Sequence, residues 1–79
     1  MSQDEEAQYT SQLEGRYANT FQVGHNAFEF FIECGQAPLS GEHSTFHTRI
    51  ITTPAYAKAL FETLKDSLEY YEQSYGAIR

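Results

Sequence analysis

The residues of this chain that could do chemistry include three histidines and one cysteine. His43 and His47 are four residues apart, a spacing that places two imidazoles on one side of a helix, where zinc can be bound. Here the pair runs from a loop into a predicted strand, so the rings need not converge, and a closed site would also need His25 and Cys34. We therefore expect no metal and no cofactor. A small metal-binding protein or enzyme that uses these four residues is an alternative.

Cys34 could act as a nucleophile only if its thiolate were exposed in an electropositive setting. It falls instead on the apolar side of a predicted strand with Phe30 and Ile32, where cysteine behaves as a small hydrophobic residue. His25, in a predicted turn, is explained by turn chemistry alone. The chain is therefore predicted to be no enzyme. Because a single cysteine cannot form an internal disulfide, we expect a reducing, cytoplasmic location.

Charged residues near the middle of the chain are better candidates for a binding surface. Glu29 and Glu33 are about 13 Å apart along a strand, too far for a paired-carboxylate site. Arg49, on a neighbouring strand, can form an ion pair with one of them, which contributes little when it is exposed. Apolar side chains share this side of the sheet, so the charges can also form the rim of a self-association patch. The candidate interface consists of Glu29, Phe31, Glu33, His47, Arg49 and Ile51.

Alternating apolar residues predict the strands that position these side chains. Residues 17–23 and 27–34 alternate on either side of the corner Gly24-His25-Asn26 and form a predicted hairpin. Residues 35–44 contain Pro38 and Gly41 and are predicted to be a loop. Residues 45–52 are rich in β-branched side chains and predict a third strand.

The last third of the chain predicts one long amphipathic helix. Thr53 and Pro54 are typical of an N-cap followed by proline at the first helical position, and Gly76 is typical of the helix end. The helix is therefore about twenty residues long, or ~30 Å. Its apolar stripe contains Ala57, Leu60, Phe61, Leu64, Leu68 and Tyr71.

These elements predict an α+β fold of β-β-β-α order: a three-stranded antiparallel meander packed on one face by a long C-terminal helix. Residues 16–79 form the single domain, and residues 1–15 are predicted to be an acidic, disordered tail. The sheet face expected to meet the helix carries Phe21, Val23, Phe28, Phe30, Ile32, Phe46 and Ile50. Because the opposite face is also partly apolar, a second copy of the chain is its simplest cover.

The charge of the chain excludes some partners. Eleven acidic residues outnumber five basic ones, which gives a net charge of −6, and this disfavours direct binding to nucleic acid or to an anionic membrane. No apolar run approaches the ~20 residues that span a bilayer. We expect a non-enzymatic homo-oligomer, most simply a dimer, that can also bind an unidentified protein partner. An acidic decoy or inhibitor of a nucleic-acid-binding protein is an alternative.

Two blocks of the sequence resemble a known family. The residues Arg16-Tyr17-Ala18-Asn19, then Val23 to Phe30, then Gly35-Gln36 are similar to the first block of the DUF3467 family of small bacterial and archaeal proteins. The run His47 to Thr52, followed by Pro54, Ala57 and Lys58, is similar to its second block. The resemblance covers roughly residues 16–78. The family is one of unknown function, so the resemblance implies no catalytic residue. Cys34 stands where the family leads us to expect an aspartate or another residue.

Overall fold

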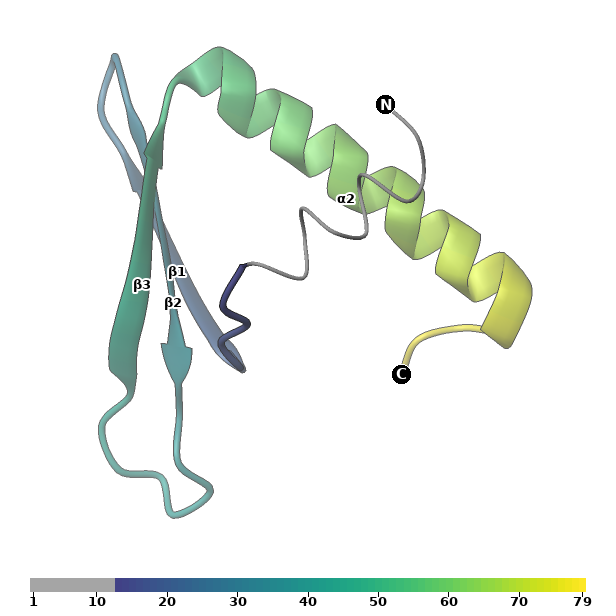
Figure 1. Cartoon of the computed structure of the whole chain (residues 1–79), viewed down its shortest axis with the longest axis horizontal. Coiled ribbons are helices and arrows are strands. Elements are labelled where there is room, and N and C mark those ends of the chain that lie inside the picture. Colours follow the sequence, from purple (N-terminus) through teal and green to yellow (C-terminus); the bar gives the residue numbers. More distant parts are fainter. Residues whose placement is uncertain (1–12) are drawn as a thin grey trace.

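The computed structural model describes residues 13–79. It shows a three-stranded antiparallel sheet followed by one long helix (Figure 1). The strands lie in the order β1-β2-β3, which confirms the predicted β-β-β-α fold. The tail predicted over residues 1–15 falls almost wholly outside the described residues. The elements are β1 (Thr20–His25), β2 (Phe30–Gln36), β3 (Thr45–Thr52) and α2 (Pro54–Tyr75).

The turn between β1 and β2 is organised by the side chain of Asn26. Its Oδ1 accepts hydrogen bonds from the backbone N–H groups of Phe28 (2.8 Å) and Glu29 (2.9 Å), an arrangement that asparagine commonly makes in turns. The corner therefore lies at residues 26–29, and His25 remains in β1, paired with Phe30. The predicted position of Phe28 on the sheet face is wrong: Phe28 lies in the turn and is 80% exposed.

An irregularity between β2 and β3 changes which side chains share a face. Cys34 pairs with Thr48, but Gly35 pairs with Phe46, so His47 is an extra residue in β3. Gly35 is buried, and a Cβ added to it would lie 2.1 Å from the backbone oxygen of Thr45. Only glycine allows this close approach, as at many β-bulges. Paired residues share a side of a sheet, so Phe46 lies on the side of Gly35, and its predicted place on the helix-facing side is wrong.

Both predicted ends of the helix are confirmed. Thr53 is the N-cap: its Oγ1 accepts from the N–H of Tyr56 at 3.2 Å, and Pro54 occupies the first helical position. At the other end Gly76 has a φ of 94°, and its N–H donates to the carbonyl of Glu72 at 2.9 Å. The same Glu72 accepts through its carboxylate from the N–H of Ile78. These contacts fix a helix of 22 residues.

The helix leaves the end of β3 and diverges from the sheet, so the two elements enclose an open wedge (Figure 1). Their apolar sides face this wedge but do not close it. Within residues 13–79 no apolar side chain is fully buried. Phe21 of β1 and Phe61 of α2 are each 64% exposed. The sheet and helix stripe predicted from the sequence are therefore both present, but a single chain does not complete a core between them.

Candidate functional site

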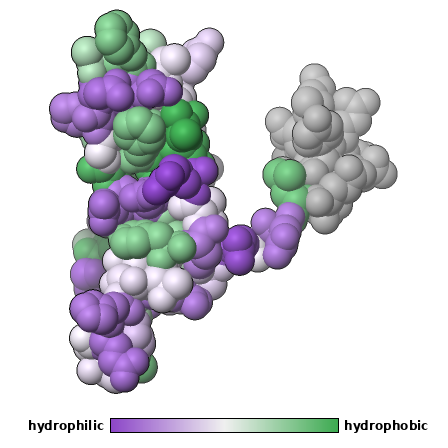
Figure 2. Space-filling model, turned by 90° about the vertical axis from the view of Figure 1, so that its left-hand side faces the viewer, coloured by the Kyte–Doolittle hydropathy of each residue, from purple (hydrophilic) through white to green (hydrophobic). Residues whose placement is uncertain are grey.

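The sheet face turned away from the helix, called here the outer face, carries five of the six residues predicted to form an interface. Phe31 lies directly opposite Ile51, and Glu33 lies directly opposite Arg49, on β2 and β3. Glu29 lies in the turn that precedes β2, at the end of this face. Figure 2 shows hydrophobic and hydrophilic bands alternating across this side of the molecule. The outer face therefore carries both apolar and charged side chains. Of its apolar pair, Ile51 is the more exposed and Phe31 is half-buried.

The two charged residues at the centre of the outer face, Glu33 and Arg49, form an ion pair with each other. Arg49 donates from Nε (2.7 Å) and from Nη2 (2.6 Å) to the same carboxylate oxygen of Glu33. The side chain of Glu33 is only 17% exposed, whereas that of Arg49 is 64% exposed. Such a cross-strand ion pair contributes little stability where solvent reaches it.

His47, the sixth predicted residue, holds the segment before β1 against β3. Its Nε2 lies 2.9 Å from the carbonyl oxygen of Tyr17, and its Nδ1 lies 2.7 Å from Oγ1 of Thr48. Arg16 donates from Nη1 to the carbonyl of His47 at 3.2 Å. Both ring nitrogens are thus engaged within the chain, which gives this imidazole a structural task.

The other residues singled out for chemistry lie apart from one another. His25 packs against Phe30 with ring centroids 5.2 Å apart, and His43 is an exposed loop residue. Cys34 is half-buried and shares the helix-facing side with Thr48, whereas His47 is the extra, unpaired residue of β3, and its ring contacts Tyr17 and Thr48. Across the part of the chain that the structure describes, no three His, Cys, Asp or Glu side chains are close enough together to hold a metal ion.

The wedge between the sheet and α2 forms an apolar groove of about 550 Å³. Polar side chains contribute little to it, and Lys58 is its one charged lining residue. Such a surface is suited to bind another apolar surface rather than a polar ligand. The groove is lined by Phe21, Val23, Phe30, Ile32, Pro54, Ala57, Lys58, Leu60, Phe61 and Leu64.

The apolar stripe of α2 continues beyond the groove. Leu68 and Tyr71 follow Leu64 at helical spacing but are not among the residues that line the groove with the sheet. They form a shallow hollow with Ile78 of the C-terminal segment. Tyr71 also packs against Tyr75 in a tilted arrangement, with ring centroids 4.9 Å apart. The stripe is therefore longer than the part of it that faces its own sheet.

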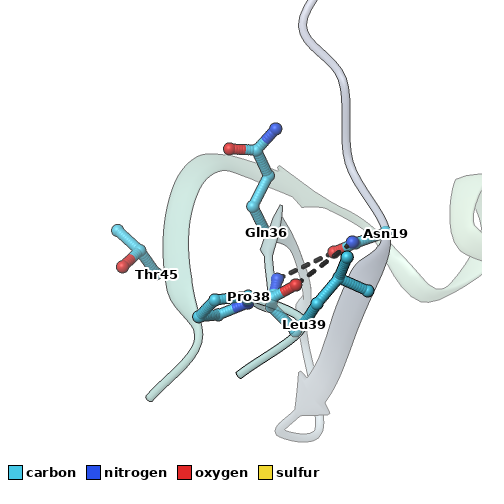
Figure 3. A pocket seen from close by; sticks show the side chains of 6 residues that line it. Asn19, Gln36, Pro38, Leu39 and Thr45 are labelled. Atoms are coloured by element: carbon cyan, nitrogen blue, oxygen red, sulfur yellow. Dashed lines mark hydrogen bonds between the residues drawn. The ribbon is translucent and has the colours of Figure 1, made fainter. Parts of the chain in front are cut away.

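A second hollow, beside the β2–β3 loop, is explained by loop structure. Asn19 accepts from the N–H of Ala37 (2.8 Å) and donates to the carbonyl of Ala37 (3.3 Å), as drawn in Figure 3. Both polar atoms of its side chain are thus used to hold the loop. Pro38 and the fully exposed Leu39 form the other wall. Gln36 and Thr45 complete the lining of this open hollow.

Sequence reasoning found the residues of the groove but assigned them to a closed core. Their signal was the alternation in β1 and β2 and the stripe in α2. The structural roles of Asn19, which holds the loop, and of Gly35, which permits the bulge, were not predicted. The sequence placed Gly35 at the start of the predicted loop over residues 35–44, whereas Gly35 lies within β2. A glycine inside a strand often marks a bulge.

A three-stranded meander and one helix that share an open apolar groove define a small α+β module of β-β-β-α order. The sequence model of a family described as "Protein of unknown function (DUF3467)" matches residues 3–79. The chain therefore belongs to the DUF3467 family, and the resemblance is confirmed. No curated protein and no solved structure matches the chain. Among residues 13–79, no helix combines the length and apolar character needed to cross a bilayer.

Several residues within the two matching blocks have structural tasks. Asn19 holds the loop after β2, and Asn26 organises the first turn. Arg16 and His47 join the segment before β1 to β3, and Gly35 permits the bulge. These residues of the two blocks thus help to build the sheet and its loops.

Proposed function

We propose that this protein is a non-enzymatic interaction module that associates with itself, in the simplest case as a dimer. The observation that carries the proposal is the open groove: apolar residues make up 41% of the sequence, yet none is fully buried within residues 13–79. Burial of apolar surface is the main favourable term in folding. A chain of this composition needs another surface to complete its core.

The exposed area matches what a stable interface needs. The apolar side chains of the groove face and of the helix stripe are each about half exposed. Taking roughly 150–250 Å² for a fully exposed large side chain, they leave on the order of 800 Å² accessible in each chain. A standard interface buries about 800 Å² on each partner. The set comprises Phe21, Val23, Ile50, Leu60, Phe61, Leu64, Leu68 and Tyr71.

The outer face stays a second candidate for self-association, or for an unidentified protein partner. Its apolar residues, Phe31, Phe46 and Ile51, form a smaller apolar surface than the groove, because Phe31 is already half-buried. The charges beside them, Glu33 and Arg49, are already paired with each other. Self-association through the groove therefore removes more apolar surface from water. Because Cys34 is the one cysteine, we also propose a reducing compartment such as the cytoplasm.

Light scattering after size exclusion, across a concentration series, tests the proposal. We expect twice the chain mass of 9.0 kDa, and a thermal midpoint that rises with protein concentration because folding is coupled to association. A folded protein with the mass of one chain, whose thermal midpoint does not depend on concentration, would contradict it.

A further inference from the structure

We infer that the occupant of the groove is α2 of a second copy of this chain, so that two copies exchange their helices reciprocally. This inference rests on the proposed self-association and specifies its geometry. It follows from three features: the junction between β3 and α2, the length of the apolar stripe, and the distribution of charge along the helix.

The junction between β3 and α2 is short and stiff. Thr53 alone separates the end of β3 from the start of α2. The following proline favours an extended backbone at Thr53, which has a φ of −83° and a ψ of 161°. The first turn is further fixed by the hydrogen bonds from Tyr56 and Ala57 to Thr53. Because this junction directs α2 away from the sheet (Figure 1), the helix does not fold flat onto the sheet of its own chain.

The apolar stripe of α2 is long enough, and apolar enough, to cover the open groove. The helix has 22 residues, or about 33 Å at 1.5 Å per residue, but its own sheet faces only the part up to Leu64. If the helix of a partner enters the groove, two-fold symmetry places the first helix in the groove of the partner. The same contact, a helix in the groove of the other copy, then occurs twice and covers both sheets and both apolar stripes. The layers would follow the order sheet, partner helix, helix, partner sheet.

The charges of α2 favour an antiparallel arrangement of the two helices. Lys58, in the first third of the helix, is the charged residue of the groove lining. Glu69 and Glu72 lie in the last third of the helix. Antiparallel helices bring the first third of one next to the last third of the other, which places Lys58 near the acidic residues of the partner. Opposite charges at the rim of an interface set register and orientation.

Cross-linking between two differently tagged copies tests the exchange. Both copies carry Cys34→Ser and are produced together, one with Val23→Cys and the other with Leu64→Cys or Leu68→Cys. Because each copy has a single thiol, a short bis-maleimide can join Val23→Cys to a helix thiol only between chains. The matched control replaces Val23→Cys with Ile51→Cys, which lies on the outer face. Circular dichroism and light scattering of each variant verify folding and mass.

Helix exchange predicts a cross-linked heterodimer with Val23→Cys and at least a tenfold weaker product with Ile51→Cys. A dimer that cross-links only through Ile51→Cys, or one in which two Val23→Cys copies join each other, overturns the exchange but leaves self-association intact. A folded monomer overturns both proposals. If Val23→Cys does not fold, Phe21→Cys, on the same face, takes its place with the same expected result.

Discussion

Arg49 reaches across from β3 to Glu33 on β2 with two donors, Nε and Nη2, that converge on one carboxylate oxygen at 2.7 and 2.6 Å. The pair lies between Phe31–Ile51 on one side and the bulge at Gly35 on the other. It therefore joins the two strands close to the point where their register changes.

We expect the loss of this ion pair to have a small effect on stability. The guanidinium is mostly exposed, and exposed pairs contribute about 0.2–1 kcal/mol. Arg49→Gln and Glu33→Gln, alone and together, form a double-mutant cycle that can be measured by urea denaturation. A coupling energy above about 2 kcal/mol would mean that the pair is desolvated, for instance inside an interface on the outer face.

Gly35→Ala should destabilise the fold severely. The added methyl group would meet the backbone of Thr45 at 2.1 Å, so the bulge must open or the strands must separate. We expect a loss of about 2 kcal/mol or more, measured by chemical denaturation. Gly24→Ala is the matched control, because a Cβ at Gly24 meets no atom within 4 Å. Equal effects of the two substitutions would contradict this account of the bulge.

The side chain of Asn26 should be replaceable by aspartate but not by alanine. Asn26→Ala removes the acceptor of two backbone N–H groups and should cost about 1–2 kcal/mol. Asn26→Asp keeps an oxygen in this position and should retain most of the stability. Amide exchange at Phe28 and Glu29 measures the effect directly. If the amides of Phe28 and Glu29 exchange fast in both variants, the hydrogen bonds to the side-chain oxygen of residue 26 are not what holds the turn.

Asn19→Ala should loosen the loop after β2 while the sheet persists. The substitution removes both side-chain hydrogen bonds to Ala37, each worth about 0.5–1.5 kcal/mol. We expect faster proteolysis within residues 37–44 and an unchanged strand content by circular dichroism. If the loop of the variant is cleaved no faster than that of the unsubstituted protein, contacts other than those of Asn19 hold the loop.

The two apolar surfaces give opposite expectations for oligomer mass. If the groove is the interface, Leu64→Asp should yield monomers or unfolded chains, because it places a charge among apolar side chains. Phe31→Ser with Ile51→Thr should then leave the mass unchanged. If the outer face is the interface, the double variant should lower the mass and Leu64→Asp should not. Light scattering with circular dichroism separates the two cases.

The sequence was sufficient for the order of elements, because alternation and helical spacing are local signals. The third strand, over residues 45–52, and the helix start at Pro54 agree with the structure. The first turn lies at residues 26–29 and not at the predicted residues 24–26, because the side chain of Asn26 accepts two backbone hydrogen bonds. Phe28 therefore lies in the turn and not in β2. The place of Phe46 was missed because one residue inserted into β3 reverses the alternation that precedes it.

The candidate site could be predicted from the sequence only in part. Alternation placed Phe31, Glu33, Arg49 and Ile51 on one face, and the pairing of β2 with β3 confirms that they share it. The direction in which α2 leaves the sheet depends on the backbone at Thr53, which no periodicity encodes. For that reason the sequence predicted a closed core where the structure has an open groove.

The bulge in β3 has a consequence for solubility. β3 is an edge strand, and an edge with a regular row of free backbone groups can recruit strands from other molecules and start aggregation. The extra residue His47 interrupts that row, and Arg49 adds a charge beside it. On the opposite edge, Gly24 weakens the strand that such pairing would extend. Both edges thus discourage growth of the sheet by strand addition.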